Sequence, residues 1–283
     1  MKKSELTPEE VQLLFPDLSV IRFVGKGSFK FVYEVYSNNV RCALKILTDD
    51  VDYNRLGRET DAMRIINSPF VAKLYEFLMV RKPEFSVEYI LEEFIEGDDL
   101  KKYIDNFKIY TAHETIIFLD QILQGLEACW ENKIVHRDIK PANIMVRNDG
   151  SPVIVDFGLS RHLDMSSLTS TNFGGTIGTP YFAPPELLEY TKNDIDSKTD
   201  LYSLGVTVYM MCTGRHPYSD VSGDYPRSIV DLLTKTALPP HEINPEIPES
   251  LSRFILRLMD RHRVKRPRDA TQARNKLSQL RLE

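Results

Sequence analysis

The hydrophobic pattern of the chain changes once, near Gly97, from a strand type to a helix type. Before this point, runs of β-branched and aromatic residues such as FVYEVY and VRCALKIL predict strands, and Asn38-Asn39 predicts the hairpin turn between these two. One helix is expected in this part, at about residues 52–66. After Gly97, apolar residues recur at helical intervals, beginning with a helix that Thr111 and Glu114 open with capping-box spacing. We therefore expect an α+β chain with a small β-rich N-lobe, a larger α-helical C-lobe and a ligand-binding cleft at their junction.

The composition is that of a folded chain, since 42% of its 283 residues are hydrophobic and 27% are charged. A formal net charge of -5 disfavours a nucleic-acid-binding protein, which would usually carry a basic face. The three cysteines are far apart and show no zinc-site spacing, which indicates a reducing compartment. We find no signal peptide and no apolar stretch long enough to span a membrane, so we expect a cytoplasmic chain.

The strongest chemical signal is the run HRDIKPAN, which begins at His136 just after the long helix and is followed by an Asp-Phe-Gly sequence. It places two carboxylates, Asp138 and Asp156, close in sequence to the amide of Asn143 and the ammonium group of Lys140. Transfer of a phosphoryl group needs oxygen ligands for a metal ion, a carboxylate near the attacking hydroxyl and a cation for the developing charge. These residues supply all three, and a solvated turn would rarely combine them by accident.

Two features of the strand-rich part are weaker when taken alone. The run GKGSFKFV, from Gly25 to Val32, could bring backbone N–H groups close to phosphates, but two glycines in a hairpin are commonly just a turn. Lys45 lies on the third predicted strand, where it is either an exposed strand residue or a phosphate ligand that reaches into the cleft.

Taken together, these motifs resemble those of the eukaryotic-type serine/threonine protein kinase domain, and the resemblance extends from about Leu18 to Leu280. It implies a two-lobed protein-kinase-like fold with an antiparallel N-lobe sheet, and a protein that moves the γ-phosphate of ATP to Ser or Thr hydroxyls of protein substrates. The cofactors implied are ATP and Mg²⁺, with Mn²⁺ as an alternative. The implied partners are a protein substrate and, transiently, a second copy for autophosphorylation in trans, with no nucleic acid and no membrane.

The resemblance also implies roles for individual residues. Asp138 would orient and deprotonate the acceptor hydroxyl, Lys140 would contact the γ-phosphate, and Asn143 and Asp156 would bind the metal ion. Lys45 would hold the α- and β-phosphates. The remaining nucleotide-binding residues implied are Gly25, Lys26, Gly27, Val32, Ala43, Glu59 as the partner of Lys45, Glu93, Ile95 and Met145. The domain boundaries implied are an extension at 1–17 and a kinase domain at 18–283, with the N-lobe at about 18–91, the hinge at about 92–97 and the C-lobe at about 98–283.

Two departures from the family pattern concern nucleotide binding. Lys30 stands where a third glycine is usual, which resembles the lysine-displaced WNK kinases; we favour Lys45 as the main phosphate ligand, with Lys30 as a solvated residue or a second contact. Glu92 aligns with the hinge gatekeeper, where an apolar residue is common, although a shift of one residue in the alignment is equally compatible with the sequence. A buried Glu92 would need a partner for its charge.

Three further expectations follow from the family pattern. Arg266 would pair with Glu186 at the end of the activation segment, and Asp200 would steady the catalytic loop. The hydroxyl-rich run from Ser166 to Thr176 would carry a regulatory phosphate, on Thr171 or Thr176.

The alternatives to a protein kinase are a pseudokinase scaffold, which typically lacks a catalytic residue that this chain has, and a small-molecule kinase, which typically has His-Gly-Asp in place of His-Arg-Asp.

Overall fold

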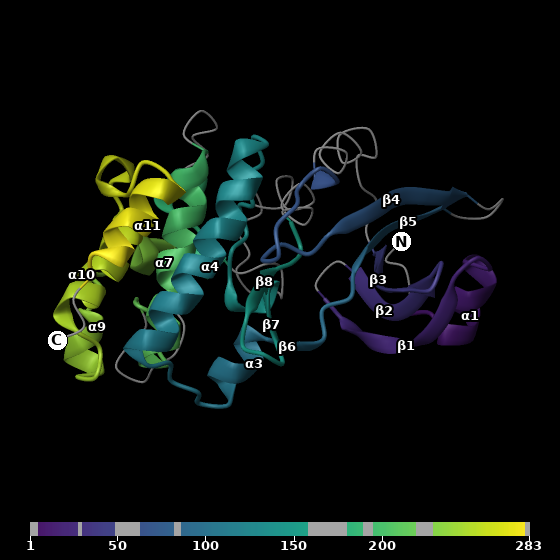
Figure 1. Cartoon of the computed structure of the whole chain (residues 1–283), viewed down its shortest axis with the longest axis horizontal. Coiled ribbons are helices and arrows are strands. Elements are labelled where there is room, and N and C mark those ends of the chain that lie inside the picture. Colours follow the sequence, from purple (N-terminus) through teal and green to yellow (C-terminus); the bar gives the residue numbers. More distant parts are fainter. Residues whose placement is uncertain are drawn as a thin grey trace. The chain divides into compact units, whose positions relative to one another are not determined.

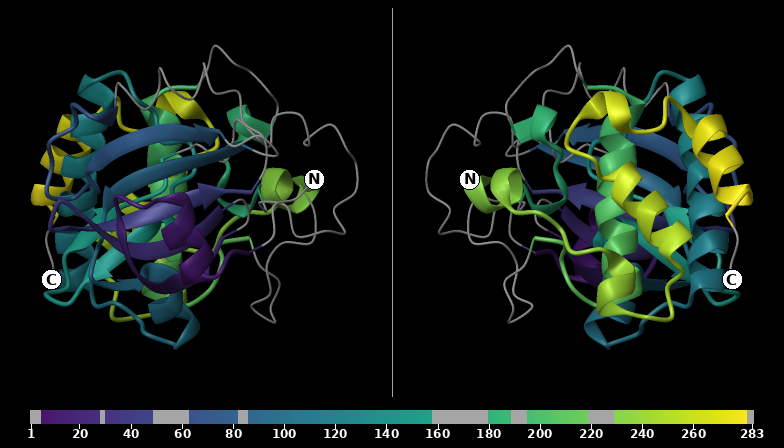
Figure 2. Two further views of the ribbon diagram at one scale, coloured as in Figure 1. Left: turned by 90° about the vertical axis from the view of Figure 1, so that its right-hand side faces the viewer. Right: turned by 90° about the vertical axis from the view of Figure 1, so that its left-hand side faces the viewer.

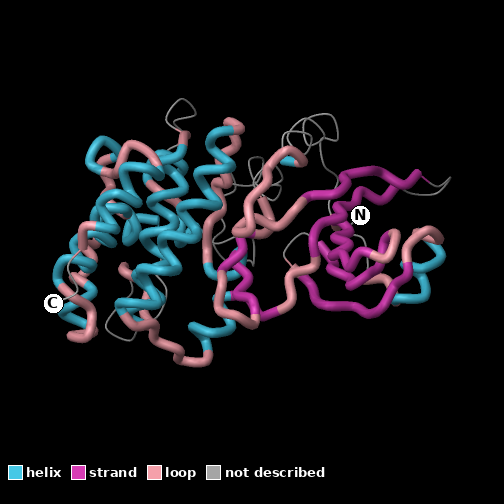
Figure 3. Tube along the Cα trace, in the orientation of Figure 1, coloured by secondary structure: helices cyan, strands magenta, loops and turns pink. Residues whose placement is uncertain are grey.

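The computed structural model describes residues 5–27, 30–48, 63–81, 86–157, 180–188, 195–218 and 229–280 (Figure 1). The chain forms two compact units. Among the described residues, the first unit contains those within 5–68 and 72–96, and the second contains those within 69–71, 97–157 and 180–280. Strands dominate the first unit and helices the second (Figure 3), as the change of pattern near Gly97 predicts.

The first unit is built on a five-stranded antiparallel sheet with the strand order β1-β2-β3-β5-β4. Its strands are β1 (Ser19–Lys26), β2 (Lys30–Ser37), β3 (Val40–Leu47), β4 (Leu74–Arg81) and β5 (Ser86–Glu93). The predicted hairpin turn joins β2 to β3, and both of its asparagines have positive φ, 49° at Asn38 and 64° at Asn39. Asparagine tolerates this conformation, and a two-residue turn of this kind matches the twist of the strands that it joins. The helix predicted at 52–66 lies mostly outside the described residues.

A short N-terminal helix, α1 (Pro8–Leu14), covers one face of this sheet (Figure 2, left). Its Val11 and the following Phe15 are buried with core residues of the strands, and the Phe15 ring meets Tyr89 edge to face at 4.8 Å. Side chains also tie the segment to the sheet, because the Tyr33 hydroxyl donates to Leu6 O at 2.6 Å and Val20 N donates to Gln12 Oε1 at 2.9 Å. The described part of the predicted extension therefore packs on the N-lobe sheet.

The second unit has a small antiparallel sheet and a set of helices. The sheet has the order β6-β7-β8, formed by β6 (Gly97–Asp99), β7 (Ile144–Arg147) and β8 (Pro152–Ile154). The described α-helices are α3 (Leu100–Asp105), α4 (Ala112–Glu131), α6 (Pro185–Leu188), α7 (Ser197–Thr213), α8 (Ile229–Thr234), α9 (Pro240–Ile243), α10 (Glu249–Leu258) and α11 (Ala270–Ser278). The described residues also include three 3₁₀ turns: η1 (Pro141–Asn143), η2 (Pro180–Phe182) and η4 (Arg263–Lys265).

Helix α7 forms the centre of this unit, and every residue from Thr199 to Thr213 is buried. Gly205 makes close packing possible here, because a Cβ atom at this position would lie only 2.8 Å from Met259 N, just after α10. Gly214 ends the helix in the left-handed conformation with φ 67°, a common C-terminal cap. Among the helices that the structure describes, none has the length and apolar character needed to cross a bilayer.

Candidate active site

The predicted catalytic loop lies between α4 and β7, and its side chains converge on the carboxylate of Asp138. Lys140 Nζ lies 2.7 Å from Asp138 Oδ2, and Asn143 Nδ2 donates to the same oxygen at 2.8 Å. Asn143 Nδ2 also donates to the backbone carbonyl of Asp138 at 2.8 Å. The structure thus brings together three of the residues to which the sequence assigns a catalytic or metal-binding role.

The buried carboxylate of Asp200, on α7, fixes the backbone of this loop. Asp200 accepts hydrogen bonds from His136 N at 2.9 Å and from Arg137 N at 2.7 Å. Arg137 also has φ 67°, a backbone conformation that is uncommon for a residue other than glycine. A third donor is Trp130 Nε1 of α4, at 2.9 Å. The conformation of the loop is therefore set by a residue more than sixty positions away in the sequence.

His136 connects the loop to the segment that carries Asp156. Its Nδ1 accepts from Asp138 N at 3.2 Å, and its Nε2 lies 3.1 Å from the carbonyl oxygen of Val155. Complete burial lowers the pKa of His136, so the ring is neutral with its proton on Nε2. The ring also packs against Phe157, with 4.8 Å between centroids. These contacts hold the catalytic loop and the Asp-Phe-Gly segment in a fixed register.

The two predicted metal ligands fit a hard divalent cation. Val155 N donates to Asn143 O at 3.0 Å, which joins the two segments that carry Asn143 and Asp156. The Asn143 amide nitrogen is used by Asp138, which leaves the amide oxygen for a metal ion. Asp156 has φ 61°, an uncommon conformation that is often found at functional sites. In the described part of the chain, no three or more His, Cys, Asp and Glu side chains form a group that could hold a metal. An ion here would therefore take its other ligands from phosphate oxygens and water, as Mg²⁺ commonly does.

The first unit carries the predicted phosphate-binding lysine on a buried strand position. Lys45 is only 5% exposed, and its ammonium group forms an ion pair with the carboxylate of Glu92 on β5. The register pairs Val32 with Lys45, and Ala43 with Glu92, so these four side chains lie on one face of the sheet. Glu92 therefore faces the same side as Lys45. Glu59, the predicted partner of Lys45, lies outside the described residues.

The glycine-rich run is described up to Gly27 and again from Lys30. Gly25 pairs with Val32 and Lys26 pairs with Phe31, so Lys26 projects from the opposite face to Lys45, and its ammonium group lies over the Phe31 ring at 5.3 Å. A Cβ atom on Gly27 would lie 3.1 Å from Lys30 Cε, so the Lys30 side chain lies directly against this glycine.

The other predicted nucleotide-binding residues belong to both units. Glu93 N donates to Lys73 O at 2.8 Å, and Ile95 is buried. Met145 lies on β7 of the second unit, paired with Asp99 and Val153. Each residue occupies a defined strand or loop position, and its role in nucleotide binding stays a prediction.

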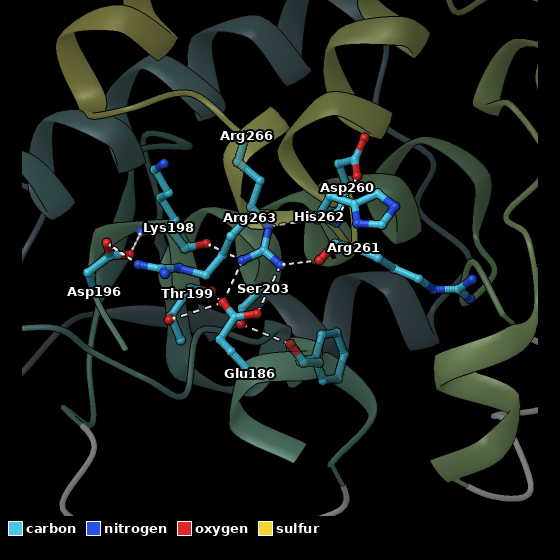
Figure 4. A network of polar contacts seen from close by, with 11 residues as sticks. Glu186, Asp196, Lys198, Thr199, Ser203, Asp260, Arg261, His262, Arg263 and Arg266 are labelled. Carbon is cyan, nitrogen blue, oxygen red and sulfur yellow. Dashed lines mark hydrogen bonds and ion pairs between the residues drawn. The ribbon is translucent and has the colours of Figure 1, made fainter. Parts of the chain in front are cut away.

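The residues predicted to close the activation segment form a buried network (Figure 4). Arg266 binds Glu186 in a bidentate manner, with Nη1 to Oε1 at 2.6 Å and Nη2 to Oε2 at 3.0 Å. The other Arg266 N–H groups donate to the carbonyl oxygens of Asp260, Lys198 and Arg261. Thr199 Oγ1 adds a contact to Glu186 at 3.3 Å. The pair anchors α6 to η4 and the start of α7.

The sequence model of the protein kinase domain matches residues 18–277. The chain belongs to the protein kinase family. A probable serine/threonine-protein kinase of Clostridium perfringens is 31% identical to it over 87% of this kinase chain, and one of Clostridium acetobutylicum is 32% identical over 91%. PrkC of Bacillus subtilis, a serine/threonine-protein kinase, is 28% identical over 84%. The kinase chain spans 36%, 39% and 36% of the lengths of these three relatives, a little over a third.

The kinase domain of Mycobacterium tuberculosis PknI has a similar fold, with a TM-score of 0.68 at 19% sequence identity. The match covers 93% of this kinase chain and 95% of the PknI chain. The predicted family and the predicted two-lobed fold class are therefore confirmed. The family uses ATP and a divalent metal ion.

Two residues that support the kinase site were not singled out by the sequence analysis. Trp130 lies at a helically spaced apolar position of α4 and is partly buried, and its N–H finds a hydrogen-bond partner in Asp200. His216 is buried after α7, and its Nε2 lies 3.0 Å from Tyr181 O in the segment before Glu186. No short motif marks either contact, because each joins segments that are distant in the sequence.

Proposed function

We propose that this chain is a serine/threonine protein kinase that transfers the γ-phosphate of ATP to a hydroxyl group of a protein substrate. The observation that carries the proposal is the carboxylate of Asp138, held by Lys140 and Asn143 in a loop that Asp200 fixes. The printed names of the relatives support the serine/threonine class, and the long segment that ends at Glu186 supports a protein substrate over a small molecule.

The chemistry assigned to the chain's own residues is general-base catalysis with charge stabilisation. Asp138 accepts the proton of the acceptor hydroxyl as its oxygen bonds to the γ-phosphorus, while the bond to the β-phosphate oxygen breaks and ADP leaves. Lys140, 2.7 Å from Asp138, offsets the negative charge on the transferred group. Asn143 and Asp156 hold the metal ion, which we assign as Mg²⁺; when bound, it neutralises charge on the phosphates. Lys45 binds the α- and β-phosphates.

Phosphate transfer from radiolabelled ATP, with Mg²⁺ and a set of generic proteins, tests this function directly. The expected result is label on protein in phosphoserine or phosphothreonine, which are less stable to alkali than phosphotyrosine. Nucleotide binding without transfer would identify a pseudokinase scaffold, and label found only in small molecules would identify a small-molecule kinase. Replacing Mg²⁺ by Mn²⁺ in the same assay tests the choice of metal.

We also propose that phosphorylation of the Ser166–Thr176 run regulates the kinase, with a second copy acting in trans. These residues lie outside the described part of the chain, so the support comes from Arg137, whose Nε is buried without a hydrogen-bond partner among the described residues. A phosphate adds about -1.5 to -2 charges and forms strong bonds to arginine. Mass spectrometry after incubation with ATP should find phosphate in this run, on Thr171 or Thr176. Full activity of protein shown to carry no phosphate would contradict the switch and leave the kinase assignment intact.

The proposed location is the cytoplasm, without a nucleic-acid or membrane partner. Cys42, Cys129 and Cys212 are free and buried, which suits a reducing compartment. Fractionation of cells, with detection of the whole protein rather than this chain alone, tests the location.

A further inference from the structure

The ion pair between Lys45 and Glu92 places a carboxylate beside the phosphate-binding lysine from within the sheet itself. Lys45 and Glu92 are 5% and 8% exposed, so both charges are almost completely removed from water. They lie on β3 and β5, which are hydrogen-bonded neighbours although they are not consecutive in the sequence. Lys45 pairs across the strands with Ile90, and Ala43 with Glu92, so Lys45 and Glu92 are diagonal neighbours on one face. Long side chains reach each other across such a diagonal.

A buried lysine keeps its charge only where a partner compensates the lost hydration. Glu92 provides such a partner from a strand whose backbone is fixed to β3 by ladder hydrogen bonds. The carboxylate therefore moves with the strand that carries Lys45. An ammonium group has three N–H donors, and the bond to Glu92 uses one of them.

We propose that Glu92 is a positioning residue for the nucleotide, which holds the Lys45 ammonium group in place before ATP arrives. The proposal rests on the proposed function, in which Lys45 binds the phosphates. It adds that the sheet itself supplies a carboxylate that orients this lysine. A group that is already oriented saves the entropy of ordering it when the ligand binds.

The sheet offers a matched control in Glu34 of β2. Glu34 is also buried, at 5% exposed, and pairs across the strands with Ala43, so it lies on the same face as Glu92. Its carboxylate is bound by other cations, Arg22 Nε at 2.8 Å and Arg41 Nε at 2.7 Å. Glu34→Gln therefore removes a buried carboxylate of the same sheet without removing the partner of Lys45.

Steady-state kinetics of Glu92→Gln, Glu34→Gln and Glu59→Gln test the proposal, with ATP and the acceptor peptide varied separately. Loss of a hydrogen bond to a charged group predicts that Glu92→Gln lowers kcat/KM for ATP by about ten- to a hundredfold. The KM for ATP should rise, the KM for the peptide should stay within about twofold, and Glu92→Asp should recover part of the loss. Glu34→Gln should leave both KM values unchanged, and Glu59→Gln in the same assay measures separately what Glu59 contributes.

Two results would overturn the proposal: kcat/KM for ATP within about twofold of the parent protein in Glu92→Gln, or tighter ATP binding in this variant, which would show that Glu92 competes with the phosphates. If Glu92→Gln does not fold, Glu92→Asp decides, because a shortened carboxylate must still raise the KM for ATP and not that for the peptide. The variant Lys45→Met distinguishes the role of Glu92 from the role of Lys45. An inactive Lys45→Met with an unaffected Glu92→Gln removes only the role of Glu92, whereas an active Lys45→Met removes the assignment of Lys45 as well.

Discussion

Replacing Arg266 by leucine should remove one of the largest single contributions to the stability of the second unit. All five N–H groups of Arg266 donate, two to Glu186 and three to backbone carbonyl oxygens. The Arg266 side chain is 0% exposed and that of Glu186 is 6% exposed, so Arg266→Leu leaves a buried carboxylate without its cationic partner. Breaking a buried pair from one side typically costs about 3–5 kcal/mol of unfolding free energy. Since a folded domain has about 5–15 kcal/mol in total, a fall in Tm of roughly 10 °C is expected.

Urea unfolding followed by circular dichroism measures this loss, and the neighbouring Arg263 provides the control. Arg263 also forms an ion pair, with Asp196, but its side chain is 26% exposed and that of Asp196 is 45% exposed. Arg263→Leu should therefore cost no more than about 1 kcal/mol. The double variant Glu186→Leu, Arg266→Leu removes both charges, so it should be more stable than Arg266→Leu alone, while the three carbonyl oxygens still lose their donor.

A loss below about 1 kcal/mol for Arg266→Leu, equal to that of Arg263→Leu, would refute this reasoning. It would mean that the Glu186 carboxylate reaches water or another cation when Arg266 is removed. A double variant less stable than either single variant would show that the carbonyl contacts, and not the charge pair, carry the stability.

Three further predictions concern catalysis and pH. Asp138→Asn should leave the affinity for ATP near normal and slow transfer by about 10²–10⁴-fold, as expected for loss of a general base. An unchanged rate constant of transfer in a single-turnover assay would contradict the role of Asp138. Lys45→Met should lose far more activity in the radiolabel assay than Lys30→Met, and the reverse order would place the chain with the lysine-displaced kinases. Burial lowers the pKa of His216 from 6.5 to about 4, so between these pH values the unfolded chain binds a proton that the folded chain does not. The free energy of unfolding should therefore fall by about 3 kcal/mol as the pH falls through this window. Urea unfolding of His216→Gln should show a flatter dependence on pH. An unchanged dependence would mean that His216 is protonated in the folded chain.

Local sequence signals predicted the elements of the fold well. The asparagine pair before β3 has the positive φ values that its turn needs, and Thr111 with Glu114 forms the expected capping box at the start of α4. The sequence also placed Asp138 and Lys140 in one short loop, where the structure joins them, and their roles in catalysis stay predictions. In each case, the interacting residues lie within one turn or one short loop, so the sequence shows them side by side.

Contacts between distant segments were less accessible from the sequence. The sequence left open whether Glu92 faces the lysine, because this depends on β5 lying beside β3 and on the register of that pair. The packing of Phe15 on Tyr89 was not predicted, since a short amphipathic helix before a domain does not reveal which surface it covers. The bond from Trp130 to Asp200 joins two helices, and its existence depends on how α4 and α7 pack.

That last contact gives the molecule a built-in optical probe. Trp130 is the only tryptophan among the 283 residues, so the indole emission of the chain has a single origin. The indole N–H is bonded to the Asp200 carboxylate, which in turn holds the backbone of His136 and Arg137. A change in the position of that carboxylate alters the electric field at the ring, and with it the wavelength of emission. Selective excitation of the indole would therefore follow the catalytic loop in unlabelled protein, during nucleotide binding, phosphorylation or unfolding, without a substitution near the site.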